Sequence, residues 1–266
     1  MEPRGPVGKP PGHRFPRKPA TWLSRRILDD LDAKHTDLIC LFLCFITALC
    51  DSSAYSVWSC YLGLQTGNTI TLGLGASGQP KSKPFGWLKS LVSISSFMAG
   101  AFTFANGLRL LGPRRAVTLS FSFLVQASLI IIASALIEAD LIPHISAATS
   151  LTGGPLFLEL IPIALLAFQS AGCLAASRFL GFNEIPIVVL TSVYFDIASD
   201  PHLLTSLLKN APRNRRLCGA VLYVVGAICG GWLSLSAGGM QSALWIAAAL
   251  KLGLAVVWLF WTKEQG

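Results

Sequence analysis

Six long apolar runs constrain the fold of this chain more than any other feature of its sequence. A helix needs about 20 mainly apolar residues to cross the hydrocarbon core of a bilayer. Charged residues make up only 13% of the chain, about half of the share that soluble domains carry. We therefore expect an all-α, polytopic integral membrane protein with about six transmembrane helices. The runs lie at residues 38–58, 87–108, 116–137, 155–177, 217–236 and 242–262.

The distribution of basic residues predicts how such helices are oriented. The chain has 21 Lys and Arg residues against 13 Asp and Glu residues, and six spans would collect most of the basic residues on one side. Because cytoplasmic segments are enriched in Lys and Arg, we expect both termini in the cytoplasm. Nucleic acid is not an expected partner, since no recognition motif accompanies the basic residues. Eight of them precede the first run: Arg4, Lys9, Arg14, Arg17, Lys18, Arg25, Arg26 and Lys34.

The chain divides into a tail and a membrane domain. Residues 1–35 are rich in Pro, Lys and Arg, a composition typical of a disordered cytoplasmic tail. Within it, residues 22–31 have apolar side chains at helical spacing, which fits either an interfacial amphipathic helix or a solvated linker. Residues 36–266 form the predicted transmembrane domain.

Two shorter apolar stretches, 61–76 and 185–198, complete the predicted membrane domain. They are too short or too polar for confident spans, so re-entrant segments, half-helices and extra spans all remain open. Each follows a long span and contains threonine, and two further spans come after it. Three spans in each half would orient the halves oppositely, and inverted 3+3 repeats with broken helices are a known transporter plan.

Two motifs resemble those of a known family. Asp51 is followed by Thr66-Gly67-Asn68-Thr69, and the second half contains the run Ile187–Tyr194. Together with Gln169, these residues resemble the YoaK family, or domain of unknown function 1275, in the form of its fungal members. The resemblance covers about residues 36–262. It implies a multispanning membrane protein that is presumed to be transporter-like and has no assigned substrate.

Ionisable residues within spans are the first candidates for function, because burying a charge in a membrane is costly. Asp51 lies about two-thirds along the first run, and we expect a helix interruption at Asp51-Ser52-Ser53 where a proton or cation could bind. Alternatively, the helix ends at Cys50 and Asp51 caps the following one. Lys251 lies in the sixth run, where it could pair with an acid or extend toward the membrane surface.

The remaining candidates are polar but uncharged. The segment Thr66–Thr69 could line a pathway if it enters the membrane, or it could be an ordinary turn. Gln169 could contact a substrate or only bond to another helix. The predicted substrate or ion pathway therefore comprises Asp51, Thr66, Gly67, Asn68, Thr69, Gln169, Thr191 and Lys251.

These features favour a transporter-like protein, coupled to protons or cations through Asp51, with an unknown small molecule or ion as substrate. The alternative is a membrane scaffold or sensor that transports nothing. We do not expect an enzyme, since the common catalytic fingerprints are absent from the sequence. We also expect no cofactor and no metal, because the seven cysteines lack the spacing of metal sites. The sequence does not indicate the oligomeric state or the cellular membrane.

Overall fold

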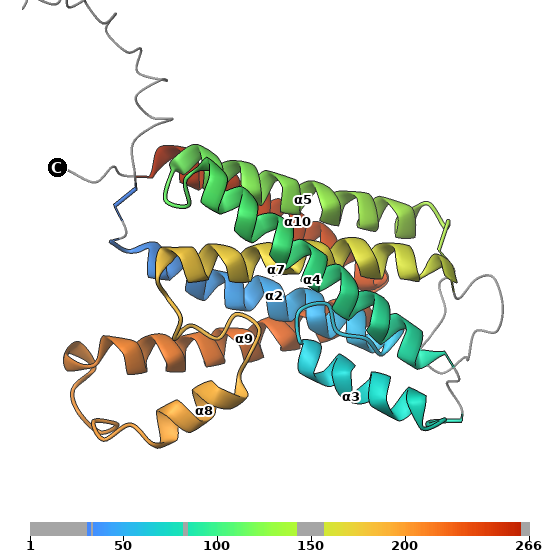
Figure 1. Ribbon diagram of the computed structural model, residues 1–266, viewed down its shortest axis with the longest axis horizontal. Helices are drawn as coiled ribbons and strands as arrows, with labels where there is room; N and C mark the ends of the chain where they lie inside the picture. Colours follow the sequence, from blue (N-terminus) through green and yellow to red (C-terminus); the bar gives the residue numbers. More distant parts are fainter. Residues whose placement is uncertain (1–30, 33, 82–84, 143–156, 262–266) are drawn as a thin grey trace, which may run out of the picture.

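The computed structural model describes residues 31–32, 34–81, 85–142 and 157–261. The described chain is helical and contains six helices long and apolar enough to cross a membrane, which confirms the predicted class (Figure 1). Most of the predicted tail, including residues 22–30, lies outside the described residues. The six long helices are α2 (Thr36–Trp58), α4 (Gly86–Leu111), α5 (Ala116–Glu138), α7 (Leu160–Leu180), α9 (Ala211–Leu235) and α10 (Gly239–Phe260).

The expected interruption of the first span is absent from α2, so that prediction is wrong. The helix runs unbroken through Asp51 to Trp58, and it does not end at Cys50 either. The serine hydroxyls cause no break because they bond back to the helix itself. Ser53 Oγ donates to the Leu49 carbonyl at 2.8 Å, and Ser52 Oγ donates to the same oxygen at 3.3 Å. Such back-bonding satisfies a hydroxyl within a helix.

The fourth span is shifted relative to its prediction. The helix α7 begins at Leu160 and ends at Leu180, whereas the sequence predicted 155–177, whose first two residues lie outside the described part. Pro162 occupies the first turn of α7, where its missing N–H leaves no hydrogen bond unmade. Gly181 follows the last residue of the helix, and its φ of +91° is the left-handed conformation that glycine adopts at helix ends.

The two shorter apolar stretches are half-helices. They form α3 (Gln65–Ala76) and α8 (Thr191–Ala198), and a short 3₁₀ turn, η1 (Leu207–Lys209), follows α8. Before each half-helix the chain turns back into the bundle, since Leu62 and Gly63 are buried, as are residues 185–188. Figure 1 shows α3 and α8 at opposite ends of the bundle. The order long–short–long–long therefore occurs twice, in opposite orientations.

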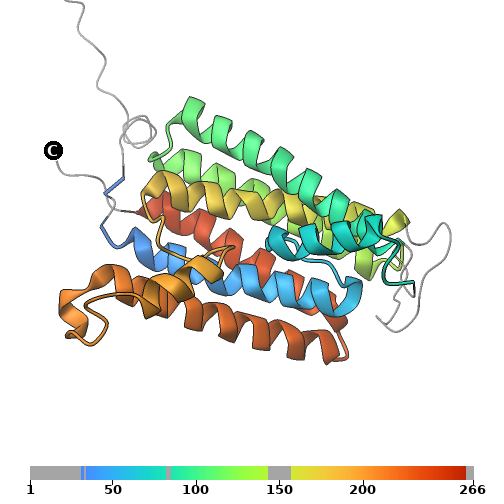
Figure 2. The ribbon, with the colours of Figure 1, turned by 60° about the horizontal axis from the view of Figure 1, so that its bottom comes forward.

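Matching contacts relate the two halves. The helix α2 packs along α9, and α4 packs along α7; Figure 2 shows α4 and α9 on opposite sides of the bundle. Each pair meets at a glycine. A Cβ on Gly226 would lie 2.3 Å from the Phe45 carbonyl oxygen, and one on Gly100 would lie 2.2 Å from the Phe168 carbonyl oxygen. Exchanging the halves thus maps one contact onto the other, as an inverted repeat requires.

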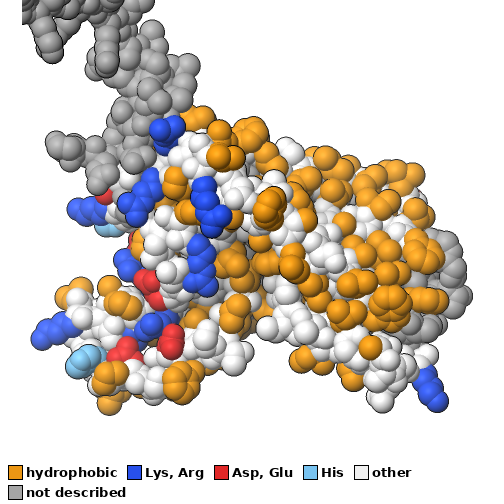
Figure 3. Space-filling view, viewed as in Figure 1, with side chains coloured by type: hydrophobic (Ala, Val, Ile, Leu, Met, Phe, Trp, Pro, Cys, Tyr) orange, Lys and Arg blue, Asp and Glu red, His pale blue; other side chains and the backbone are white. Residues whose placement is uncertain are grey.

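Charged side chains gather at one end of the bundle, where α2 begins and α10 ends (Figure 3). We call this the basic end; its described basic residues include Arg109, Arg114, Arg115, Arg215 and Arg216. Hydrophobic side chains cover most of the remaining surface in that view. This separation suits a protein whose middle contacts lipid tails and whose basic end contacts water.

Candidate functional site

Asp51 is a buried carboxylate of α2 that faces the interior of the bundle. Its side chain is buried, and α2 continues seven residues beyond it to Trp58, which places it about 10 Å below that end of the helix. Asp51 Oδ1 accepts hydrogen bonds from the backbone N–H groups of Leu62 at 2.7 Å and Gly63 at 2.8 Å. Tyr223 of α9 donates its hydroxyl to Oδ2 at 3.1 Å. The carboxylate therefore ties two helices to the segment preceding α3.

That segment, residues 60–64, is called the re-entrant loop below. Its close approach to Asp51 depends on Gly63. A Cβ at this position would lie 2.8 Å from Ser170 Oγ and 3.2 Å from Asp51 Oδ2, so a larger residue would push the loop away. Glycine thus allows backbone N–H groups to reach the carboxylate, the role it often takes where a backbone approaches a polar site.

Lys251 lies inside the bundle and not at its surface, so the expectation that it extends toward the membrane surface is wrong. Only 1% of the residue is exposed. Its ammonium group donates to Gln126 Oε1 of α5 at 2.8 Å and to Gln169 Oε1 of α7. Two amide oxygens stabilise the charge, because each presents the negative end of its dipole to the ammonium.

A small cavity separates Asp51 from Lys251. Its volume of about 10 Å³ is close to the space that one water molecule requires. Its walls come from α2, the re-entrant loop, α7 and α10, and the buried Ser170 Oγ has no hydrogen-bond partner among the described residues. Three pairs of lining residues are each 123 positions apart in the sequence: Ile46 and Gln169, Thr47 and Ser170, Cys50 and Cys173. The cavity therefore lies where the two halves of the repeat meet.

Asn68 belongs to a different network from the cavity. Its side chain donates to the Tyr61 carbonyl at 2.7 Å and to Ser93 Oγ of α4 at 3.0 Å. Its Oδ1 accepts the Tyr61 backbone N–H at 3.0 Å. Neighbouring Gly67 allows the Tyr61 ring to pack closely, since a Cβ there would lie 2.7 Å from a ring carbon. Asn68 and Gly67 thus hold the re-entrant loop against α3 and α4.

The three candidate threonines face outward. Thr66 and Thr69 of α3 are exposed, as is Thr191 at the start of α8, and none of them lines the cavity. Thr69 Oγ1 donates to the Gln65 carbonyl at 2.8 Å, a bond within its own helix. Of the eight candidates, the structure therefore brings together Asp51, Gln169 and Lys251.

Two residues of the site were not among the sequence candidates. Gln126 bonds to Lys251 and also accepts from the Cys173 thiol at 3.3 Å, and Tyr223 bonds to Asp51. Gln126 carried a usable signal, because an amide in the otherwise apolar middle of α5 must find a partner. Tyr223 carried none, since a tyrosine in an apolar run is ordinary.

The chemistry available at this site is proton exchange and polar binding. Within the described residues, no group of three or more His, Cys, Asp or Glu side chains could hold a metal ion. The cavity brings a carboxylate, an ammonium group, an amide, two hydroxyls and two thiols together. Asp51 accepts three hydrogen bonds from N–H and O–H donors, two at Oδ1 and one at Oδ2.

The comparison with protein families agrees with this architecture. A family model described as "Protein of unknown function (DUF1275)" matches residues 39–257, nearly the whole of the described membrane domain. This match confirms the resemblance expected from Asp51 and Thr66-Gly67-Asn68-Thr69, while the fungal form stays a prediction. No curated protein and no solved structure matches the chain.

Proposed function

This chain belongs to the DUF1275 family, and we propose that it is a proton-coupled membrane carrier in which Asp51 binds the proton. A carrier of this kind moves a small molecule or ion and catalyses no reaction. The basic end faces the cytoplasm, since Lys and Arg are retained on that side. Both termini then also lie in the cytoplasm, as the basic tail predicts.

One observation carries the proposal. A buried carboxylate holds the re-entrant loop by two backbone N–H groups, about 10 Å below the end of α2. Bonds from N–H donors to an ionised carboxylate are about twice as strong as those to a neutral acceptor. Protonating Asp51 therefore weakens the attachment of the loop, and deprotonating it restores the attachment.

The charged and titratable groups around Asp51 fit this role. Tyr223 donates to it from α9, Lys251 faces it across the cavity from α10, and the thiols of Cys50 and Cys173 line the same space. An ionised Asp51 offsets the charge of Lys251, and a protonated Asp51 leaves that charge in need of another counterion. Proton binding and the binding of an anionic or polar solute are thus linked at one cavity.

Alternating access follows from the inverted repeat. The cavity lies between halves of opposite orientation. Each half also has one segment that enters the bundle, and the two segments enter from opposite ends. Release of the loop before α3 opens a path from the end opposite the basic end. Movement of the segment before α8 opens a path from the basic end, as rocking of one repeat against the other does in known carriers.

Cysteine accessibility tests the proposal without a known substrate. In a variant that keeps only Cys50 and Cys173, a water-soluble thiol reagent added outside sealed vesicles reports whether the cavity is open. Asp51→Asn mimics the protonated carboxylate, so at neutral pH we expect its labelling to be several-fold faster than that of the wild type. Acid lowers the reactive thiolate fraction equally in both proteins, so the ratio of their labelling rates is the readout. This ratio should approach one at acid pH, because protonation of Asp51 releases the loop in the wild type as well.

A matched control and a transport assay complete the test. Glu138→Gln removes an exposed carboxylate at the end of α5, outside the cavity, and it should leave the pH dependence of labelling unchanged. A solute that stabilises the purified protein in a thermal-shift screen should cause proton uptake into vesicles with the wild-type chain but not with Asp51→Asn. Normal uptake by Asp51→Asn would refute the proposal. Loss of function on deletion of residues 1–35 alone would then favour a scaffold or sensor.

A further inference from the structure

A second cavity lies between α4 and α5, away from Asp51. Its volume is about 170 Å³, and it opens at the side of the bundle, because two of its lining residues, Leu111 and Phe121, are more than half exposed. We call it the lateral fissure. Its walls are almost entirely apolar and include Phe104, Gly107, Leu108, Leu111, Phe121 and Val125.

The absence of a side chain at Gly107 keeps this fissure open. A Cβ at Gly107 would meet nothing within 4 Å. The close-packed glycines Gly100 and Gly226 are 126 positions apart, and the same spacing aligns Gly107 with Leu233 of α9. Leu233 packs against the hydrophobic core. The half that contains α9 therefore fills this position with a leucine, and the half that contains α4 leaves it open.

Arginines stand where the fissure reaches the basic end. Arg115 Nη1 donates to the carbonyl of Leu111, a lining residue, at 3.3 Å, and exposed Arg114 precedes it. Among the described residues, the ion pairs at the basic end involve Arg215 and Arg216, and no carboxylate pairs with Arg114 or Arg115. Within the described part of the chain, these two guanidinium groups therefore have no carboxylate partner, and such groups bind anions well.

We propose that the lateral fissure binds one acyl chain of an anionic phospholipid, whose net negative headgroup is held by Arg114 and Arg115. The opening of the fissure is apolar and lies between parts of α4 and α5 that would contact lipid tails, so hydrocarbon chains can reach it. Arg114 and Arg115, which pair with no carboxylate among the described residues, select an anionic headgroup, as basic pockets at the cytoplasmic surface do. The lipid completes the packing between α4 and α5 and has no part in the chemistry at Asp51.

Native mass spectrometry of the purified full-length protein tests the proposal. Phosphatidylserine and phosphatidylcholine with the same acyl chains are the probes. We expect one retained phosphatidylserine per chain and about tenfold weaker retention of phosphatidylcholine. The reason is that each of the two arginines attracts a net negative headgroup at the membrane surface and so strengthens its binding. Equal retention of both lipids would overturn the selection of an anionic headgroup.

Matched variants separate the two parts of the site. Gly107→Leu fills the fissure and should abolish retention, whereas Gly253→Leu makes the same change at an exposed glycine with nothing within 4 Å and should retain the lipid. Arg114→Gln with Arg115→Gln should reduce phosphatidylserine retention to the level of phosphatidylcholine. Unchanged retention by Gly107→Leu would refute the proposal.

Photolabelling of the wild-type protein covers the case in which Gly107→Leu does not fold. Phosphatidylserine with a photoreactive group on its acyl chain should attach to peptides that contain residues 103–111 and 118–125. Labelling spread evenly over all six long helices would contradict a specific site. Both experiments measure lipid alone, so their outcome is independent of whether Asp51 couples transport to protons.

Discussion

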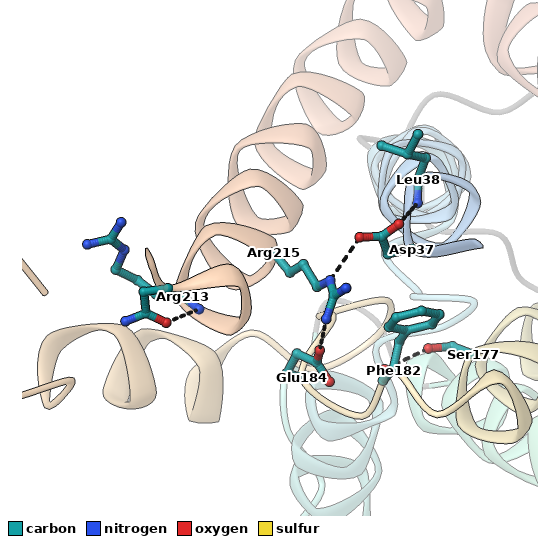
Figure 4. A network of polar contacts seen from close by, with 8 residues as sticks. Asp37, Leu38, Ser177, Phe182, Glu184, Arg213 and Arg215 are labelled. Atoms are coloured by element: carbon teal, nitrogen blue, oxygen red, sulfur yellow. Dashed lines mark hydrogen bonds and ion pairs between the residues drawn. The ribbon is translucent and has the colours of Figure 1, made fainter. Parts of the chain in front are cut away.

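The two segments that enter the bundle follow similar paths but are held by different interactions. The re-entrant loop before α3 is held by buried groups, chiefly Asp51 and Asn68. The segment before α8 has no such carboxylate in the matching place, because Leu174 stands 123 positions after Asp51. Its residues Ile185, Ile187 and Val188 pack in the hydrophobic core. Its charged contacts lie near the surface, where Arg215 bridges Asp37 of α2 and Glu184 (Figure 4).

Because of this difference, we expect the polar contacts of one segment to respond to pH and those of the other to respond to salt. Hydrogen bonds at a buried carboxylate change with its protonation, whereas partly exposed ion pairs weaken as salt is added. The region after α8 also depends on exposed groups, and hydrogen bonds from Asn210 and the His202 backbone lower the pKa of Asp200. The polar contacts of the re-entrant loop therefore depend on the protonation of Asp51, whereas water and ions can reach the polar contacts of the segment before α8.

Replacing Asn68 should have the largest effect on stability. Asn68→Ala removes the bonds to Tyr61 and Ser93 and leaves the partly buried Tyr61 N–H without its acceptor, at a cost of about 3 kcal/mol in the free energy of unfolding. Thermal unfolding in detergent measures the loss. Asn106→Ala is the control, because Asn106 is more exposed and bonds only within α4; an equal loss in both variants would contradict the role of Asn68.

Adding a methyl group at Gly63 should have the next largest effect. Gly63→Ala brings a Cβ to within 2.8 Å of Ser170 Oγ, so the loop must shift away from Asp51, at a cost of about 2 kcal/mol. Gly73→Ala in α3 meets nothing within 4 Å and should be neutral or slightly stabilising. Thiol labelling of Cys50 should also become faster in Gly63→Ala. Slow labelling like that of the wild type would contradict the importance of this close approach.

Removing Arg215 should have a smaller effect that depends on salt. Arg215→Ala loses both ion pairs of a side chain that is 29% exposed, and we expect about 1 kcal/mol of destabilisation at low salt. The difference from the wild type should shrink in high salt, whereas the effect of Asn68→Ala should not. Arg215→Lys should restore only part of the stability, since an ammonium group cannot present two separate N–H donors to Asp37 and Glu184 as a guanidinium group does. A salt-independent loss would show that packing on Phe182 matters more than charge.

Neutralising Asp196 should have the smallest effect. Its ion pair with Arg216 spans 3.5 Å, and its side chain is 43% exposed, so Asp196→Asn should cost at most about 0.5 kcal/mol. The melting temperature in low salt measures this change. A loss as large as that of Arg215→Ala would mean that α8 is held more firmly than its contacts indicate.

The sequence predicted the spans and the buried charges because both depend on composition over a short stretch. A run of 20 apolar residues has few alternatives to a membrane helix, and a charge within it, as at Asp51 or Lys251, is visible at once. The same local information fails at Asp51-Ser52-Ser53, where three consecutive polar residues predicted a break in the helix. The helix continues because hydroxyls can bond to the preceding turn and the carboxylate finds backbone donors from another segment.

The partners of each candidate could not be predicted, because they come from distant parts of the chain. The donors to Asp51 are backbone N–H groups, which have no sequence signature, and a tyrosine 172 positions away. The outward direction of Thr66 and Thr69 depends on which face of α3 packs on α4. Asn68 lies on the packed face, whereas Thr66 and Thr69 are exposed. Sequence alone therefore identified the motif but not which of its residues is buried.

The depth of Asp51 has a consequence for how the membrane potential acts on this protein. About 10 Å of a hydrocarbon core roughly 30 Å thick separates the carboxylate from the end of α2 opposite the basic end. A proton that reaches Asp51 from that side crosses about a third of the electric field. At a potential of about 100 mV, negative at the basic end, this crossing is worth about 0.8 kcal/mol. Voltage alone then raises the affinity of the site for a proton from that side about fourfold.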